Sequence, residues 1–436
     1  MNHYKSTESD WDSDCDSSDC DNSDCDNSDC DNSAKKRKTQ HLDESDWDSD
    51  SENSAKKSKT QDIVEYARES HSSESDWDSD CDSDNSAKRL KTQPNEPKEL
   101  LTDDTGHIKW YTGQQIGDYI VETELGEGTF GRVMKVRDIN TGQAAALKVV
   151  KNQPGQRKSV MDEVIALKVI GSRDDMKSCL CVHMISWFSC GGHICIAFPL
   201  LGSSVYDFMK DNHFQPFLLD EVQHIGHQLC AAVSFLHENH ITHTDLKTEN
   251  ILFVNSSYTT VYCEERNLEL KRLRSTNIRL GDFGNVVRDG EYHPEIIGTR
   301  YYRSPEVILR LDWNDTCDVW ALGCILFELY SGKLLFPTEY DYEHLALMEA
   351  IIGKIPEEMT NASNTTYFKN GNLDFNWSNA EEHAQYNRRP LEDFRMDDSQ
   401  YLDDLFYAME RMLQHEPTRR ISSTEALTLP LWNDLH

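Results

Sequence analysis

The chain has 436 residues and a formal net charge of −33, with 77 acidic against 44 basic side chains. Both the first 99 residues and the remainder are acidic, which disfavours nucleic acid as a direct partner and favours basic proteins or peptides. No apolar run reaches the length that a membrane span needs, so no membrane association is expected. The length allows one large domain or two to three smaller ones.

The first 98 residues form a degenerate acidic repeat. The block ESDWDSD begins at Glu8, Glu44 and Glu74, and a basic block that begins NSAK follows each copy. Alternating Asp and Ser with few aliphatic residues cannot bury enough surface to offset the loss of chain entropy. Residues 1–98 are therefore predicted to be a disordered acidic tail.

Two functions suit this tail. Serines flanked by acidic residues are predicted targets of an acid-directed protein kinase, whose phosphate would deepen the negative charge; they include Ser9, Ser13, Ser45 and Ser75. The basic run at residues 35–38 (KKRK) predicts a nuclear import signal. The alternative is that the basic blocks only balance charge within the tail.

A folded domain is predicted from residue 103 onward. A turn at residues 104–106 precedes a predicted strand at 107–111, and a second strand is predicted at 119–125. The next eight residues, GEGTFGRV, fit the pattern G-x-G-x-x-G-x-V. A dinucleotide-binding turn would be followed by a helix, whereas residues 132–137 have the alternation of a strand. A strand–glycine turn–strand unit predicts a flap whose backbone N–H groups approach nucleotide phosphates.

Two charged residues after the flap are predicted to form a pair. Lys148 lies in an apolar run typical of a strand, from which it could bind the α- and β-phosphates of a nucleotide. A buried ammonium needs an anion, and Glu163 in the helical pattern of residues 159–170 is the predicted partner. Taken alone, each side chain is equally well explained as solvated.

The stretch HITHTDLKTEN (240–250) holds polar residues at fixed offsets. A helix predicted at 215–239 leads into it, and a buried strand predicted at 251–254 follows it. Asp245 is predicted to accept the proton of an attacking hydroxyl, Lys247 to face the moving phosphate, and Asn250 to hold a metal ion. An ordinary polar turn is the alternative that this stretch alone leaves open.

A further carboxylate follows a polar excursion at residues 255–277. Asp282 in the sequence GDFG is predicted to be the second metal ligand, because Mg²⁺ prefers a few protein oxygens together with substrate phosphates. Glu306, in the sequence SPE, would need a buried cation, and Arg420 is the predicted partner. The apolar run at 319–330 predicts a buried helix.

These elements in this order resemble the eukaryotic protein kinases over about residues 103–436: the glycine flap, Lys148, Glu163, HTDLKTEN, GDFG and SPE. Within that superfamily, EHLALMEAIIG (343–353) is similar to EHLAMMERILG, the signature of the LAMMER, or Clk-type, dual-specificity kinases. It departs from the signature at Leu347 and Ala350. Thr244 and the approach TRYYR to the SPE sequence are also similar to Clk-type enzymes.

The resemblance implies an α+β fold of two lobes, an N-lobe at about 103–200 and a C-lobe at about 201–436. It implies ATP and Mg²⁺ as cofactors, with adenine at the linker after Phe198, where the Pro199 carbonyl and the Leu201 N–H would bind it. It implies that Lys148, Glu163, Asp245, Lys247 and Asn250 carry the transfer of phosphate. The nucleotide would also be enclosed by Leu125, Gly126, Glu127, Gly128, Thr129, Phe130, Gly131, Arg132, Val133, Ala146 and Leu252.

The resemblance further implies a nuclear enzyme, with the cytoplasm as a second location, that phosphorylates Ser, Thr and, at least on itself, Tyr. Its expected substrates are Arg/Ser-rich splicing factors, and its kinase domain is expected to be monomeric. Thr244 replaces an arginine that usually clamps a phosphate of the activation loop, so activity without such phosphorylation is expected. Thr248 and Pro199 replace the usual proline and glutamate, and the tail lacks Arg-Ser runs. A catalytically weak scaffold and a Dyrk-like, proline-directed kinase are the alternatives.

Overall fold

The computed structural model describes residues 101–436 except 129, 154, 173–179, 264–266, 380–381, 434 and 436. The acidic tail, with its serines and its KKRK run, lies outside the described residues, and so does Thr129 of the glycine flap. None of the helices described here is long and apolar enough to cross a bilayer.

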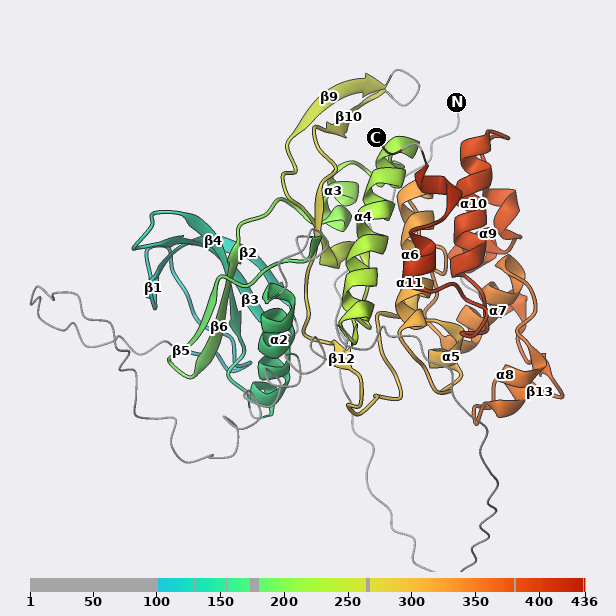
Figure 1. Cartoon of the computed structure of the whole chain (residues 1–436), viewed down its shortest axis with the longest axis horizontal. Helices are drawn as coiled ribbons and strands as arrows, with labels where there is room; N and C mark the ends of the chain where they lie inside the picture. Colours follow the sequence, from blue (N-terminus) through green and yellow to red (C-terminus); the bar gives the residue numbers. More distant parts are fainter. Residues whose placement is uncertain are drawn as a thin grey trace, which may run out of the picture. The chain divides into compact units, whose positions relative to one another are not determined.

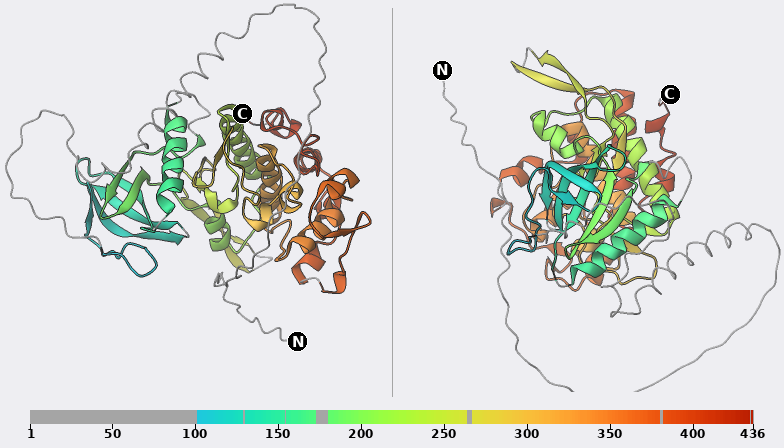
Figure 2. Two further views of the ribbon diagram at one scale, coloured as in Figure 1. Left: turned by 90° about the horizontal axis from the view of Figure 1, so that it is seen from below. Right: turned by 90° about the vertical axis from the view of Figure 1, so that its left-hand side faces the viewer.

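An antiparallel sheet of six strands forms the first part of the described chain, in the order β1-β2-β3-β4-β6-β5 (Figure 1). The strands are β1 (Gln115–Ile116), β2 (Tyr119–Gly128), β3 (Gly131–Asp138), β4 (Ala144–Val150), β5 (Ser186–Cys190) and β6 (His193–Pro199). Helix α2 (Gln156–Gly171) follows β4 and lies against the sheet (Figures 1 and 2). This part lies within the predicted N-lobe of about residues 103–200, and its last strand, β6, ends at Pro199.

Two apolar clusters stabilise the sheet. Alternate residues of β2, β3 and β4, among them Val121, Met134 and Leu147, are buried in one cluster together with Ile108. Residues of α2 such as Val164 belong to a second cluster, which continues into the helical part of the chain. The sheet is therefore packed through side chains of period two, as expected for antiparallel strands with one covered face.

The remainder of the chain is mainly helical. Its helices are α3 (Val205–Asp211), α4 (Leu219–Glu238), α5 (Pro305–Ile308), α6 (Thr316–Ser331), α7 (Asp341–Ile351), α8 (Glu357–Ala362), α9 (Glu382–Asn387), α10 (Gln400–Met412) and α11 (Ser423–Ala426). Short 3₁₀ turns are η2 (Thr248–Asn250), η3 (Arg300–Tyr302), η4 (Trp377–Asn379), η5 (Leu391–Phe394) and η6 (Pro430–Trp432). Every residue of α6 from Cys317 to Tyr330 is buried, which confirms the predicted buried helix.

Small two-stranded sheets lie beside the helices. They pair β7 (Ile241–Thr242) with β12 (Val287–Arg288), β8 (Ile251–Phe253) with β11 (Ile278–Leu280), β9 (Tyr258–Cys263) with β10 (Leu268–Leu273), and β13 (Phe368–Lys369) with β14 (Asn372–Leu373). The first two pairs place the two ends of the HITHTDLKTEN stretch against the segments that flank Asp282. The β9–β10 hairpin, which projects from the helical part in Figure 1, occupies the predicted polar excursion.

Two predicted elements differ from the structure. Residues 107–111 form no strand; only an isolated bridge joins Thr102 to Ile108, because side-chain hydrogen bonds of Asp103 hold this segment as a turn. Helix α4 begins at Leu219 rather than at residue 215, since Pro216 disfavours a helical residue before it. The Glu221 carboxylate then accepts a hydrogen bond from the Leu218 N–H and caps the first turn.

Candidate active site

The catalytic loop between β7 and β8 (residues 243–250) is anchored on helix α6. Asp318 accepts hydrogen bonds from the backbone N–H of His243 at 2.7 Å and of Thr244 at 2.9 Å. Thr244 has φ of 67°, a left-handed conformation that is rare for a β-branched residue. Its hydroxyl donates to the Asn285 carbonyl at 2.7 Å. These bonds hold a strained backbone in place just before Asp245.

The Asp245 carboxylate is held by two neighbours. Its Oδ1 accepts hydrogen bonds from the N–H of Thr299 at 2.8 Å and from the Thr299 hydroxyl at 2.7 Å. Its Oδ2 lies 3.1 Å from Lys247 Nζ, which also donates to the Thr299 hydroxyl at 2.9 Å. Burial alone would raise the pKa of Asp245, but Lys247 and Thr299 outweigh it and lower the pKa. The carboxylate is therefore ionised and fixed in direction at neutral pH.

Lys148 on β4 contacts two carboxylates, one on helix α2 and one at the start of the activation segment. Its Nζ lies 2.8 Å from Glu163 Oε1 on α2, as predicted, and 3.2 Å from Asp282 Oδ1. Burial lowers the pKa of Lys148, but the Glu163 and Asp282 carboxylates outweigh it and raise the pKa. Lys148 also holds the pKa of Asp282 below its usual range against the effect of burial. The half-buried Lys148 ammonium thus links the sheet to Asp282.

Asn250 and Asp282 fit a divalent cation. The Asn250 side-chain amide donates to the Asp245 carbonyl at 2.8 Å, so the amide oxygen points away from that carbonyl. The Gly281 N–H donates to the Asn250 carbonyl at 2.8 Å, which brings Asp282 next to Asn250. Within the described part of the chain no three His, Cys, Asp or Glu side chains gather as a metal cluster. Two oxygen ligands suit Mg²⁺, which keeps water or phosphate as its other ligands.

The glycines of the β2–β3 flap differ in what surrounds them. A Cβ on Gly126 or Gly128 would meet no atom within 4 Å, so the backbone there is open to a ligand. A Cβ on Gly131 would lie 2.3 Å from the Val149 carbonyl oxygen of β4. Two glycines therefore leave the backbone accessible to phosphates, while the third allows β3 to pack closely on β4.

The residues expected around adenine come from both parts of the chain. The register of β3, β4 and β6 places Val133 opposite Lys148 and Ala146 opposite Phe198. Leu252 forms a bridge with Ser204 beyond the linker that holds Leu201. Leu125, Glu127 and Pro199 are exposed, and Phe130, Arg132 and Leu201 are half-buried.

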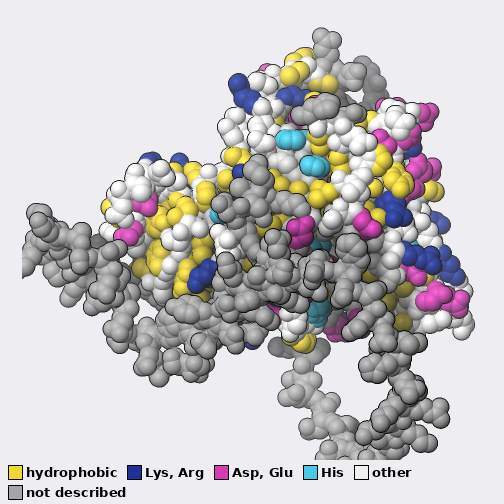
Figure 3. Space-filling view, viewed as in Figure 1, with side chains coloured by type: hydrophobic (Ala, Val, Ile, Leu, Met, Phe, Trp, Pro, Cys, Tyr) yellow, Lys and Arg dark blue, Asp and Glu magenta, His cyan; other side chains and the backbone are white. Residues whose placement is uncertain are grey.

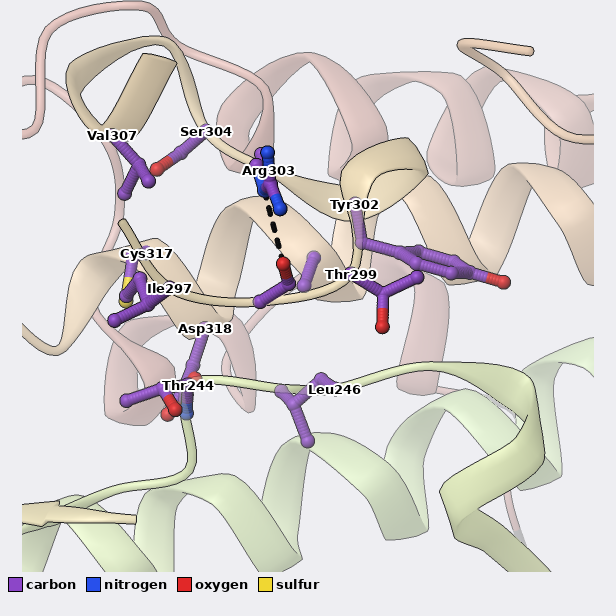
Figure 4. A pocket seen from close by; sticks show the side chains of 12 residues that line it. Thr244, Leu246, Ile297, Thr299, Tyr302, Arg303, Ser304, Val307, Cys317 and Asp318 are labelled. Atoms are coloured by element: carbon purple, nitrogen blue, oxygen red, sulfur yellow. Dashed lines mark hydrogen bonds between the residues drawn. The ribbon is translucent and has the colours of Figure 1, made fainter. Parts of the chain in front are cut away.

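The end of the activation segment (residues 282–306) packs directly on the catalytic loop. A cavity of about 10 Å³ lies between Thr244 and residues 297–307, and Figure 4 shows the side chains that line it. That volume holds at most about one water molecule. Arg303 donates through Nε to the Gly298 carbonyl at 2.9 Å, which closes the segment on itself. The predicted pair of Glu306 with Arg420 is confirmed, with two hydrogen bonds of 2.7 and 2.8 Å.

Two residues of this site were missed by the sequence analysis. Thr299 was noted only as part of the sequence TRYYR, although both of its donors reach Asp245. Asp318 was not singled out, because it lies in an apolar helical pattern 74 residues from the N–H that it binds. A charged residue next to a long apolar run was the available signal, since a buried charge needs partners.

Comparison with known proteins identifies the family. Residues 119–432 match the family described as "Protein kinase domain". The chain is 45% identical over 349 residues to the serine/threonine-protein kinase Doa of Drosophila melanogaster, an alignment that covers 78% of this chain and 42% of Doa. It is 42% identical over 339 residues to the human dual specificity protein kinase CLK2, covering 77% of this chain and 68% of that protein.

Solved structures agree with these sequence relatives. The crystal structure of a kinase domain superposes with a TM-score of 0.69 at 32% identity, covering 76% of this chain and 100% of that one. The chain spans less than half the length of Doa and about two thirds of CLK2. Its sheet-based first part and helical second part are the two lobes of this fold. The chain belongs to the protein kinase family and, within it, to the LAMMER, or Clk-type, dual-specificity kinases.

Proposed function

We propose that this chain transfers the γ-phosphate of ATP, with Mg²⁺, to Ser and Thr of basic, Arg/Ser-rich proteins, and to Tyr at least in autophosphorylation. The observation that carries this proposal is the arrangement at Asp245, an ionised carboxylate beside Lys247 and linked through Asn250 to Asp282. ATP and Mg²⁺ supply the transferable phosphoryl group and the neutralisation of its charge when they are bound.

The roles of the side chains follow from their positions. Asp245 orients the substrate hydroxyl and accepts its proton, because its carboxylate is ionised and held by Thr299. Lys247 and Lys148 offset the negative charge that develops during transfer. Glu163 keeps the Lys148 ammonium in place. Asn250 and Asp282 would hold the metal ion, and the open backbone at Gly126 and Gly128 would contact the phosphates.

Acidic residues beside the catalytic loop support a basic substrate. Burial raises the pKa of Tyr206, and the carboxylates of Glu249, Asp207 and Glu328 raise it further, so these three groups share one neighbourhood. Glu249 and Asp207 are exposed, and Glu249 is two residues from Lys247. No Lys or Arg in the described part of the chain forms an ion pair with Glu249 or Glu328 within 4.0 Å. Glu328 is buried, whereas the exposed carboxylates of Glu249 and Asp207 offer acceptors to an arginine of the substrate.

The test is a radiometric assay on three substrates: an Arg-Ser peptide, a proline-directed peptide and casein. We expect preference for the Arg-Ser peptide and loss of activity in Lys148→Arg. Asp245→Asn should lower kcat by roughly 10³-fold while the Kd for ATP stays within about twofold. Preference for the proline-directed peptide would support a Dyrk-like enzyme, and equal activity of wild type and Lys148→Arg would support a scaffold.

We also propose a nuclear location, with the cytoplasm as a second one, supported by the KKRK run and by the expected substrates. A fluorescent fusion of the full chain tests this. Replacing residues 35–38 with alanine should move the signal to the cytoplasm. Unchanged nuclear accumulation would show that this run is not the import signal.

A further inference from the structure

The segment of residues 101–110, which we call the strap, folds against the glycine flap. Its turn is built by Asp103, whose Oδ1 accepts hydrogen bonds from the N–H of Thr105 at 3.0 Å and of His107 at 2.9 Å. Ile108 is 1% exposed and belongs to the apolar cluster of the six-stranded sheet. A buried side chain and a capped turn therefore fix the strap to the body of the N-lobe.

From this fixed position the strap contacts both strands of the flap. The Ile108 carbonyl accepts a hydrogen bond from Arg132 Nη1 on β3 at 2.7 Å. Arg132 in turn donates through Nε to Glu127 Oε2 of β2 at 2.8 Å. The Trp110 indole N–H donates to Glu124 Oε2 of β2 at 2.6 Å. His107 Nε2 lies 3.6 Å from Glu127 Oε1.

These contacts lie next to the glycines with an accessible backbone. Glu127 separates Gly126 from Gly128, and Arg132 follows Gly131 directly. A flap of two strands joined by glycines has little side-chain packing of its own, because Gly126 and Gly128 meet no neighbouring atoms at the Cβ position. Its position over a nucleotide therefore depends on contacts made by the residues between the glycines.

We propose that the strap is a positioning device for the phosphates of the nucleotide. Trp110 acts through Glu124, and the Ile108 carbonyl acts through Arg132. Together they hold the flap in the position from which its backbone N–H groups reach phosphate oxygens. They are positioning groups, since they contact neither the nucleotide nor the substrate hydroxyl. This inference rests on the proposed function for ATP, and it adds the residues that set the affinity for its phosphates.

The experiment uses the full chain and two variants that break one bond from opposite sides. Trp110→Phe keeps an aromatic ring but removes the N–H, and Glu124→Ala removes the acceptor. The matched control is Trp432→Phe, which removes an indole hydrogen bond of 2.6 Å to the Ala426 carbonyl in the helical lobe. Circular dichroism melts identify any variant that fails to fold, and the other strap variant then carries the test.

Binding of ATP and of adenosine is measured separately, by titration of each with Mg²⁺ present. We expect both strap variants to raise the Kd and the KM for ATP about three- to tenfold and to leave the Kd for adenosine and kcat at saturating ATP within about twofold. Glu124 Oε2 also lies 3.8 Å from Arg132 Nε, so the double variant should be no worse than Glu124→Ala, which already removes the bond to Trp110. Trp432→Phe should change neither Kd.

Two results would overturn the proposal. Equal weakening of ATP and adenosine would mean that the strap supports the lobe in general, and unchanged ATP binding in both folded variants would mean that it does not position the flap. Failure of the proposed function would give a different result: wild-type protein would bind ATP without phosphorylating any peptide. The Kd values for ATP and adenosine would still test the strap in that case.

Discussion

Thr299 fixes the direction of the Asp245 carboxylate, which we propose to be catalytic, because it donates two hydrogen bonds to Asp245. Thr299→Val removes the hydroxyl but keeps the N–H and the shape of the side chain. We expect kcat to fall roughly 10- to 100-fold, with the KM for ATP unchanged. Thr299→Ser keeps the hydroxyl and should restore most of the activity. A Val variant with wild-type kcat would mean that Lys247 alone orients Asp245.

Thr244 gives a second test at the scale of one residue. Its hydroxyl donates to the Asn285 carbonyl, and a threonine at this position offers no guanidinium to a phosphate on the activation segment. We therefore expect protein treated with phosphatase to keep its full rate towards an Arg-Ser peptide, as measured after mass spectrometry confirms that no phosphate remains. An enzyme that is inert until its activation segment is phosphorylated would contradict this prediction.

Residue types with strict chemical needs were predicted correctly from the sequence. Lys148 and Glu306 were each assigned a partner because a buried charge needs one, and the structure contains both pairs. The role of Thr299 was not predictable in the same way, since half of its contact with Asp245 is made by a backbone N–H. Any residue type carries that donor, so its position depends on the path of the chain.

At the scale of elements, helix α6 supports the site through two buried acids. Asp318 anchors the catalytic loop, and Glu328 accepts a hydrogen bond from the Tyr302 hydroxyl at 2.6 Å. Burial raises the pKa of Glu328 to about 7. The hydrogen bond from Tyr302 lowers this pKa, and the negative charge of Glu249 raises it, but both effects are smaller than that of burial. The helix therefore carries one acid that holds the catalytic loop through its backbone N–H groups and a second acid, Glu328, whose protonation changes near neutral pH.

The pKa of Glu328 predicts a dependence of stability on pH. The folded protein binds this proton more tightly than the unfolded chain, so the free energy of unfolding falls as pH rises from about 4.5 to about 7 and is level above that range. Glu328→Gln should therefore raise the free energy of unfolding by about 3 kcal/mol at pH 8 and change it little at pH 4.5.

Urea unfolding of wild type and variant at the two pH values checks this prediction. The matched control is Glu358→Gln on α8, since Glu358 is exposed and should give the same small difference at both values. A Glu328 variant whose effect is independent of pH would show that the carboxyl is ionised throughout the range.

The elements themselves were predictable to different degrees. Helices α4 and α6 and strand β2 have apolar residues that bury one face or the whole element, and they form where the pattern indicated, except that α4 begins four residues later. The expected strand at 107–111 is absent because the chain turns back on residues 101–103: the Asp103 carboxylate accepts from the His107 N–H, and the Lys109 N–H donates to the Leu101 carbonyl. The apolar periodicity of a sequence does not indicate which hydrogen bonds will compete with the pairing of strands.

At the scale of the whole molecule, the net charge of −33 favours the approach of basic proteins or peptides over a distance. On the face shown in Figure 3, acidic and basic side chains are interspersed over the helical part and do not gather in one acidic patch. Long-range attraction by the net charge should be screened by salt.

This gives a prediction for binding kinetics. Between about 50 and 300 mM salt, the KM for an Arg-Ser peptide should rise roughly three- to tenfold, while kcat remains constant. The KM for ATP is the internal control, because its contacts are local and include a metal ion. Equal changes in both KM values would show that salt acts on the enzyme and not on the approach of the peptide.

The buried pair of Glu306 with Arg420 has a consequence for synthesis of the chain. The two residues are 114 positions apart, and both are almost fully shielded from water. During translation Glu306 leaves the ribosome long before its only strong cationic partner among the described residues exists, at about 5–20 residues per second. For those seconds Glu306 lacks the partner with which it is buried in the folded protein, so we expect the end of the activation segment to dock only after Arg420 has been made.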